Sequence, residues 1–199
     1  MAPSGPPRAR VSANVGWGRA FLAFGDEDVT FERVAVLGSS DLFLGRYTLT
    51  LGAGGVPTGS LEGKRTYDLR AGFVGSAALS WRVFDEQPTL PYVVLTAAFS
   101  GMRARVELDD QVGQWLATDF RFSVTAGKSL DWVSPYLSLR VFGGPVFFSF
   151  DDETRVGGDR YHVQAALGAV FILPEGFDLF GELAPVAEQS LYAGIGYRY

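Results

Sequence analysis

His162 is the only histidine of the chain, and its surroundings decide whether it could take part in catalysis. A serine or a carboxylate within hydrogen-bonding reach would make it a general base of the kind that activates a hydrolytic nucleophile. The candidates in the sequence are Ser138, Ser149 and Asp159. Spacing alone does not rank them, and a lone histidine is more often a hydrogen-bonded structural residue. We therefore predict a non-enzymatic protein, with a lipid-processing hydrolase as an alternative.

A second set of chemically active residues consists of arginines and acids that share the polar phase of alternating segments. Arginine suits an ion-pair network because its planar guanidinium pairs bidentately with a carboxylate and keeps its charge. Seven arginines against four acids leave three positive charges in excess, which would favour anions in any open pathway. The predicted network, with His162 in the same phase, consists of Arg46, Asp68, Arg70, Arg82, Asp119, Arg121, Arg140, Arg160, Asp178, Glu182 and Arg198.

Acidic clusters at residues 26–28, 109–110 and 151–153 offer oxygen ligands of the type that hard cations prefer. None has the spacing of an EF-hand, so they are more typical of solvated loop tips. The chain has no cysteine, which excludes thiolate metal sites and disulfides. We expect no metal and no cofactor. The net charge of −5 also disfavours a nucleic-acid partner.

Strict alternation of apolar and polar residues predicts the elements that carry these groups. The clearest case is residues 67–83, where Tyr67, Leu69, Phe73, Leu79 and Trp81 share one face. At roughly 3.3 Å per residue this run would be about 50 Å long, whereas ordinary soluble strands have about 5–6 residues. A tilted strand of this length spans a membrane and projects beyond it.

Alternating segments recur along the rest of the chain and predict an antiparallel up-and-down β-barrel of ten strands. Acidic or Gly-rich connections, including residues 52–63, alternate with a second class that includes residues 38–41. An up-and-down barrel has this property because its two rims face different environments. Eight strands, with residues 11–40 as a plug or arm, is the alternative. The predicted strands cover residues 11–24, 29–38, 41–54, 66–84, 91–108, 115–127, 135–150, 159–173, 177–184 and 189–199.

The first ten residues are Pro-rich and lack an apolar core segment, so they are not a signal peptide as they stand. They fit either a mature N-terminus with an added methionine or the loose tail of a cytosolic protein. In both cases we expect residues 1–10 to be disordered and residues 11–199 to form the barrel.

A transmembrane barrel and a soluble lipocalin-like barrel both have one apolar face, so the polar face must distinguish them. Here that face carries Gly, Ser and Ala with spaced Arg and Asp, and the chain has only two lysines, Lys64 and Lys128. Such a face suits a crowded lumen better than a solvated surface. We therefore expect an outer face in contact with lipid, which includes Tyr67, Leu69, Phe73, Leu79, Trp81, Leu167 and Phe171.

The final residues, Gly-Ile-Gly-Tyr-Arg-Tyr, form an alternating strand that ends in an aromatic residue. This end resembles the C-terminal strand of Gram-negative outer-membrane barrels, and the layout of residues 11–199 resembles the small OmpA/OmpX/OmpW-like class. The resemblance implies a location in the cell outer membrane and partners in outer-membrane lipid and lipopolysaccharide. It also implies that the barrel-assembly machinery reads Tyr197 and Tyr199. We expect a porin-like monomer with a structural or narrow-channel role.

Overall fold

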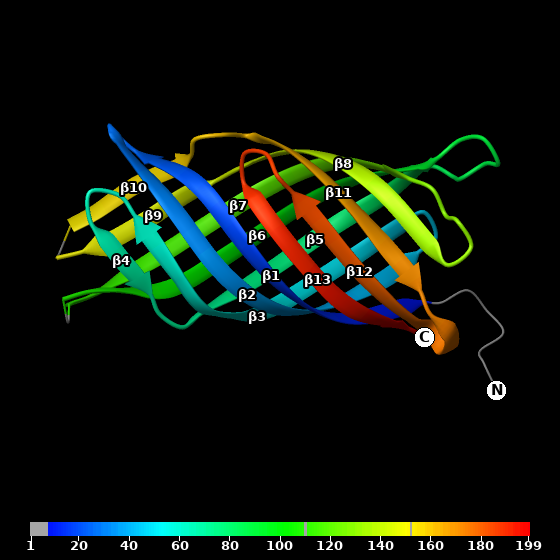
Figure 1. Cartoon of the computed structure of the whole chain (residues 1–199), viewed down its shortest axis with the longest axis horizontal. Coiled ribbons are helices and arrows are strands. Elements are labelled where there is room, and N and C mark those ends of the chain that lie inside the picture. The colour runs from blue at the N-terminus through cyan, green and yellow to red at the C-terminus, as the bar shows by residue number, and fades with distance from the viewer. Residues whose placement is uncertain (1–7, 110, 152) are drawn as a thin grey trace.

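The computed structural model describes residues 8–109, 111–151 and 153–199, and most of them lie in antiparallel strands that close into a barrel (Figure 1). Among these residues, no helix has the length and apolar character needed to cross a membrane. The elements are β1 (Ala9–Phe24), β2 (Glu27–Leu44), β3 (Tyr47–Glu62), β4 (Thr66–Leu69), β5 (Gly72–Phe84), β6 (Tyr92–Leu108), β7 (Gln111–Gly127), β8 (Val133–Gly143), β9 (Pro145–Phe150), β10 (Glu153–Asp159), β11 (Val163–Ile172), a 3-10 turn (Pro174–Gly176), β12 (Phe177–Ala184) and β13 (Gln189–Arg198).

The described chain has thirteen strands rather than the predicted ten. The difference arises because three of the predicted strands are each interrupted, at residues 70–71, at Gly144 and at residues 160–162. Thirteen segments with three interruptions leave ten passages of the chain through the wall. The eight-strand alternative is wrong, because residues 11–40 lie in β1 and β2 and form part of the wall.

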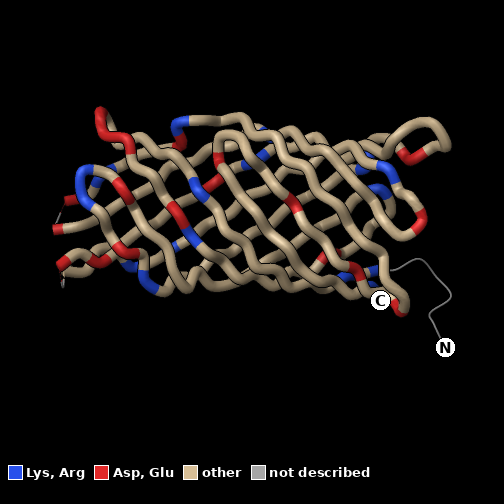
Figure 2. Tube along the Cα trace, in the orientation of Figure 1, with Lys and Arg blue, Asp and Glu red and all other residues tan. Residues whose placement is uncertain are grey.

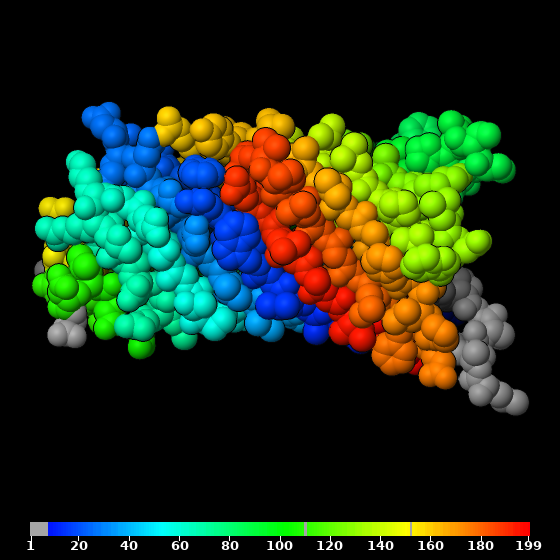
Figure 3. All heavy atoms as spheres, in the orientation of Figure 1, coloured from blue at the N-terminus to red at the C-terminus, as the bar shows by residue number. Residues whose placement is uncertain are grey.

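The barrel closes where the first strand meets the last. Ten consecutive residue pairs join β1 to β13, from Arg10 with Arg198 to Arg19 with Gln189. Beyond that point β1 continues past the end of the β12–β13 hairpin and pairs with β10 at only Leu22 and Ala23. Figure 3 shows β13 lying directly against β1 along this seam.

Ala9, where β1 begins, and Tyr199, the last residue, lie together at one end of the barrel, which we call the terminal end, on the right in Figure 1. The turns after Phe24, Glu62, Leu108 and Phe150 lie at the opposite end, which we call the far end. Successive connections alternate between the two ends, as the up-and-down topology requires. The β12–β13 turn differs from the other turns, because it lies part of the way along the wall instead of at the far end.

Two predicted connections are strand instead. Residues 38–41 lie within β2, and residues 52–63 lie almost entirely within β3. The glycines there allow close strand contact rather than a turn, because a Cβ on Gly54 would collide with the Val36 carbonyl beside the bulge in β2. The turn between these strands is at Gly45, whose φ of +64° lies in the left-handed region that glycine tolerates.

The outer wall carries a continuous apolar belt. Leu79 and Leu167 are 51% and 55% exposed, and Phe73, Trp81 and Phe171 also point outward. Charged residues are sparse along the middle of the barrel and gather towards the ends, above all the far end (Figure 2). An apolar exterior of this kind does not fit the soluble lipocalin-like alternative, whose apolar face would lie inside.

Tyr67 and Leu69 do not share the outward orientation predicted for them. The interruption at residues 70–71 reverses the phase of the chain, so that Leu69 is 2% exposed and Tyr67 packs against the interior cluster. β4 lies at the far end, where the interior is apolar and the exterior is charged. The sequence shows uninterrupted alternation across this point and therefore hides the reversal.

Aromatic pairs decorate the outer surface near the terminal end. Tyr47 stacks on Trp81 with ring centroids 6.4 Å apart, and Phe177 lies 4.9 Å from Tyr197. Membrane barrels place such aromatic residues at the level of the lipid headgroups. These aromatic pairs form a girdle at the terminal-end edge of the apolar belt. The girdle and the belt together mark the part of the wall that suits a bilayer.

The chain enters the wall earlier than predicted. β1 begins at Ala9, and the backbone N–H of Ala9 donates to the Tyr199 carbonyl at 3.2 Å. The predicted tail therefore loses Ala9 and Arg10 to the barrel. The disorder predicted for residues 1–7 concerns a segment that lies outside the described residues.

The two faces of β5 give a matched test of orientation. Leu79 points outward in the belt, whereas its neighbour Ala78 lines the interior. We expect Leu79→Arg to reduce folding into lipid vesicles, because an arginine on the lipid face has a free-energy cost that rises with depth to about 2–4 kcal/mol at the bilayer midplane. Ala78→Arg should fold nearly as well as the parent chain. The folded fraction is measured from the faster migration of unboiled barrel on a denaturing gel, and equal losses for both variants would contradict the assignment of faces.

Candidate functional site

The interior of the barrel is divided into an apolar part at the far end and a polar part at the terminal end. The apolar part is a cluster of buried side chains from β1 to β7 and from β9, which we call the plug. Its fully buried centre includes Trp115 and Val106, which are 1% and 0% exposed. The buried members of the plug are Leu22, Phe24, Phe31, Val56, Leu61, Leu69, Val74, Met102, Ala104, Val106, Trp115, Val146 and Phe148.

Charged side chains extend across the lumen next to the plug, on its terminal-end side, and form what we call the ionic layer. Arg140 Nη2 lies 2.5 Å from Glu182 Oε2, and the Tyr136 hydroxyl donates to the same oxygen at 3.1 Å. Glu182 is 3% exposed, so its charge depends on these partners. A carboxylate in such a position is strongly destabilising if its partner is removed.

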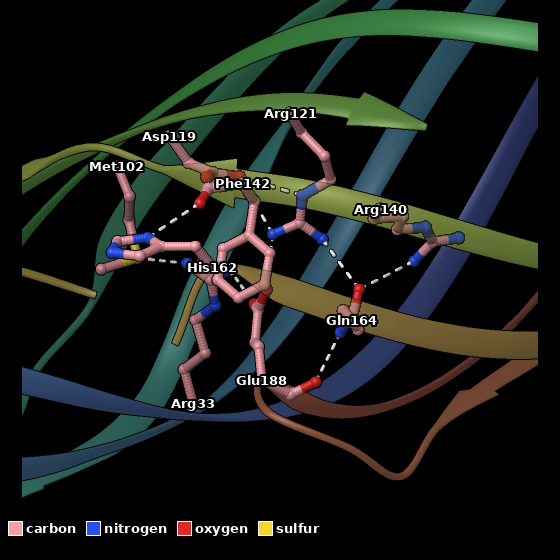
Figure 4. A network of polar contacts seen from close by, with 9 residues as sticks. All are labelled: Arg33, Met102, Asp119, Arg121, Arg140, Phe142, His162, Gln164 and Glu188. Atoms are coloured by element: carbon pink, nitrogen blue, oxygen red, sulfur yellow. Dashed lines mark hydrogen bonds and ion pairs between the residues drawn. The ribbon is translucent and has the colours of Figure 1, made fainter. Parts of the chain in front are cut away.

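Arg121 and Glu188 form the second half of the ionic layer (Figure 4). Arg121 Nη2 contacts Glu188 Oε2 at 2.5 Å and Asp119 Oδ2 at 3.0 Å. Gln164 joins the two halves, because its Oε1 accepts from Arg121 at 3.5 Å and from Arg140 at 3.3 Å. Its Nε2 donates to the backbone carbonyl of Glu188.

Arg33 links the ionic layer to the plug. Its Nη2 lies 3.9 Å from Glu188 Oε1, and its Nη1 donates to the sulfur of Met102 at 3.3 Å. Glu188 comes from the short β12–β13 turn, which reaches only part of the way along the wall and so places this side chain inside. The last hairpin therefore contributes to the closure of the lumen as well as to the wall.

A separate group of ion pairs lies inside the terminal end. Arg10 contacts Asp178 at 2.6 Å and Asp41 at 3.0 Å, and Arg198 contacts Asp178 at 3.2 Å. The Thr50 hydroxyl donates to the second oxygen of Asp41 at 2.6 Å. Asp178 is completely buried, so this group ties the first strand to the last two at the point of closure.

Between these two charged levels lies a cavity of about 710 Å³. Its wall includes four arginines, Arg10, Arg33, Arg121 and Arg140, and four acids, Asp41, Asp119, Glu182 and Glu188. The charges of the lining are therefore balanced. The predicted excess of three positive charges is absent from this cavity.

Six residues of the predicted network point into the lumen. They divide between the two charged levels instead of filling the interior, and they are Asp119, Arg121, Arg140, Asp178, Glu182 and Arg198. The far half of the lumen is filled by apolar side chains, which corrects the expectation of a lumen packed throughout by ion pairs.

The other six residues lie elsewhere. Arg46 pairs with Asp85 at the terminal rim, and Arg70 pairs with Glu107 on the outer surface of the far end. Their alternation continues beyond the membrane-facing part of each strand, where the exterior is wet and accepts charge. The residues that the structure places at exposed positions are Arg46, Asp68, Arg70, Arg82, Arg160 and His162.

Neither predicted serine pairs with His162. Asp159 and His162 both lie near Gly143, but no hydrogen bond or ion pair joins them in the described part of the chain. His162 Nδ1 lies 3.1 Å from the Phe142 carbonyl oxygen. Ser138 Oγ instead accepts from the Thr125 hydroxyl and from Arg140 Nε, and Ser149 contacts Thr154. Arg160, two residues before His162, pairs with Asp28 at the surface.

Four charged residues of the lumen were not predicted, because each was assigned to a tail, a poorly alternating segment or a loop: Arg10, Arg33, Asp41 and Glu188. One signal was available for Arg10. Extending the phase of Val11 and Val15 back by one residue places Arg10 on the inner face with Ser12 and Asn14. Glu188 had no such signal, because only the height of the β12–β13 turn carries it inside.

The acidic clusters carry no metal site within the described part of the chain, where no group of three or more His, Asp or Glu side chains could hold an ion. Asp110 and Asp152 lie outside the described residues. Glu27 and Asp28 pair instead with Arg155 and Arg160.

Comparison with solved structures shows the fold of Gram-negative outer-membrane β-barrels. The chain is similar to the outer membrane protease OmpT from Escherichia coli, with a TM-score of 0.57, 8% identity and 96% of each chain covered. It is also similar to the translocator domain of the autotransporter NalP from Neisseria meningitidis, with a TM-score of 0.54, 12% identity, and 100% of this chain and 90% of that chain covered. The β domain of the Bordetella autotransporter BrkA gives 0.53 at 17% identity, with 95% and 99% covered. No family model and no curated protein matches the chain.

The prediction of a non-enzymatic protein is corrected by these similarities. One of the similar barrels is a protease, so this fold accommodates catalysis and an enzymatic role is compatible with it. The resemblance to outer-membrane barrels is confirmed for the fold.

The Arg140–Glu182 pair provides a test of the ionic layer. We expect Arg140→Leu to lower the free energy of unfolding by about 3–5 kcal/mol, because it leaves Glu182 buried without its partner. The double variant Arg140→Leu/Glu182→Leu should recover much of this loss, since it removes both charges. Urea titrations of the detergent-solubilised barrel measure the difference, and a double variant no more stable than the single one would contradict the buried pair.

Proposed function

We propose that this chain is an outer-membrane β-barrel with a channel or structural role, whose pathway is closed at the far end. The single observation that carries the proposal is that the plug and the ionic layer close the far-end side of a cavity of about 710 Å³. The apolar belt and the aromatic girdle support a location in the outer membrane, as does the fold.

The plug supports a closed pathway because its aromatic rings interlock across the lumen. Trp115 lies 5.2 Å from Phe31, 6.1 Å from Phe24 and 6.1 Å from Phe148, measured between ring centroids. These rings come from β1, β2, β7 and β9, so they bridge opposite parts of the wall. A dry apolar constriction resists the passage of ions because it offers no partner for their hydration shells.

The ionic layer adds a second barrier. Arg121, Arg140 and Gln164 are held by hydrogen bonds from three directions, and a solute would have to displace Glu188 to pass them. The anion preference expected from the sequence depended on an excess of positive charge. Because the lining of the cavity is balanced in charge, we no longer expect that preference. We propose a small conductance without marked ion selectivity.

The outer surface supports the remaining parts of the proposal. Outer-membrane lipid and lipopolysaccharide would contact the belt, and the barrel-assembly machinery would read the strand that ends at Tyr197 and Tyr199, both exposed in β13 or directly after it. The closed wall completes its hydrogen bonding within one chain, which supports a monomer.

Conductance in planar bilayers tests the closed pathway. We expect very small currents from the parent chain and larger, steady currents from Trp115→Ala/Phe148→Ala, because this variant removes two rings from the centre of the plug. The two truncations also cost about 3–5 kcal/mol each, so the folded fraction must be checked by gel migration before recording.

Phe73→Ala is the matched control, because it removes an aromatic side chain that faces outward instead of into the plug. Its currents should equal those of the parent chain. A large steady conductance from the parent chain would contradict the closed pathway. A plug variant that folds and still conducts no better than the parent would contradict the role of the plug and assign the barrier to the ionic layer.

A further inference from the structure

The cavity between the two charged levels has features of a binding site that the proposed barrel role does not require. Its volume of about 710 Å³ falls within the range of roughly 300–1,000 Å³ found for small-molecule sites. Its lining extends from Tyr92 and Arg10 near the terminal end to Arg121 and Glu188 in the ionic layer. A solute would enter from the terminal end, since the plug closes the other side.

Two carboxylate oxygens of the lining residues lack hydrogen-bond donors within the described part of the chain. Glu182 Oε1 and Asp119 Oδ1 are buried and have no hydrogen-bond partner among the described residues. Glu182 is 3% exposed, and only its other oxygen is engaged by Arg140 and Tyr136. Neither oxygen is exposed to the cavity, so each carboxylate has to turn towards the cavity to meet a ligand donor. A buried acceptor left unpaired is destabilising, so a donor that pairs with it there gains the corresponding free energy.

The charge and polarity of the lining select the class of ligand. Four arginines are balanced by four acids, which leaves no net charge to attract an ion. The remaining polar groups are mainly hydroxyls, which both donate and accept. The serines and threonines in the lining are Ser12, Ser39, Thr50, Ser76, Thr96, Ser100, Ser123, Thr125 and Ser190.

Aromatic side chains complete the site on one side. Tyr136, Phe180 and Tyr192 line the same cavity as Glu182, and Tyr92 lies towards the terminal end. The guanidinium of Arg10 lies 4.9 Å from the Phe180 ring centroid, which helps to hold that ring in place. Flat apolar rings next to paired donors and acceptors match a molecule that has both C–H faces and hydroxyl edges.

We propose that this cavity binds a neutral, hydroxyl-rich molecule of the size of a short saccharide, with its hydroxyls donating to Glu182 and Asp119. The tyrosine and phenylalanine rings pack against the faces of the sugar rings. Arg121 and Arg140 hold the two carboxylates in position, and the balance of charge keeps the site from being selective for an ion.

Isothermal titration calorimetry on the folded barrel tests the proposal. An amine-oxide detergent is used because glycoside detergents would compete for the site. The probes are maltose and diacetylchitobiose, with spermidine as a cationic comparison. We expect saturable binding of at least one saccharide and at least about tenfold weaker binding of spermidine, since the lining has no net charge.

Variants locate the binding. Glu182→Gln should weaken saccharide binding by about tenfold or more, because it replaces a charged acceptor by a neutral one. Ala98→Trp should abolish it by filling the cavity from β6 without altering Glu182 itself, so it keeps the test valid if Glu182→Gln fails to fold. Glu32→Gln is the control, because Glu32 pairs with Arg19 outside the cavity lining.

The proposal is overturned by any of three results. The first is that the parent chain binds neither saccharide, and the second is that spermidine binds as tightly as the saccharides or more tightly. The third is saccharide binding that is unchanged in a folded Ala98→Trp variant, because the ligand would then lie elsewhere.

Discussion

Closure of the sheet is the constraint on which the rest of this structure depends. A bilayer offers no water to an unpaired backbone N–H or carbonyl group, so a sheet within it must have no free edge. The ten residue pairs between β1 and β13 meet this requirement in the part of the wall that carries the apolar belt. Ion pairs inside the barrel stabilise the same seam, because they join the first strand to the last two through Arg10, Asp178 and Arg198.

Once the wall is closed, the interior and exterior become two separate environments, and their polarity changes along the barrel. In the belt the outside is apolar and the inside holds the cavity and its charged levels. At the far end the arrangement reverses, with the plug inside and charged residues outside. The reversal separates a solvated cavity from the far end, and the ionic layer lies at the boundary between the two.

Much of the wall is predictable from the sequence, because alternation reports which side chains share a face. The strands that end at Phe24, Leu108 and Gly127 follow from that pattern to within a few residues. Alternation does not indicate which environment each face contacts, so the inward orientation of the Tyr67 and Leu69 side chains could not be predicted from the sequence. The glycines of residues 52–63 were misread for a related reason: a glycine that permits close strand contact has the same letter as one that makes a turn. The ionic layer was half predictable, because Arg121 and Arg140 lie on regular strands, whereas Glu188 reaches the lumen only through the low turn of the last hairpin.

We propose that the lumen opens towards the terminal end and is closed at the far end. The chain contains no cysteine, so a single Ser39→Cys variant gives one labelling site inside the cavity. The direct measurement is the rate of reaction with a membrane-impermeant maleimide added separately to each side of a bilayer that holds the barrel in one orientation. The account predicts rapid labelling from the side of the terminal end and little or none from the other side. Equal labelling from both sides, or labelling from the far end alone, would contradict it.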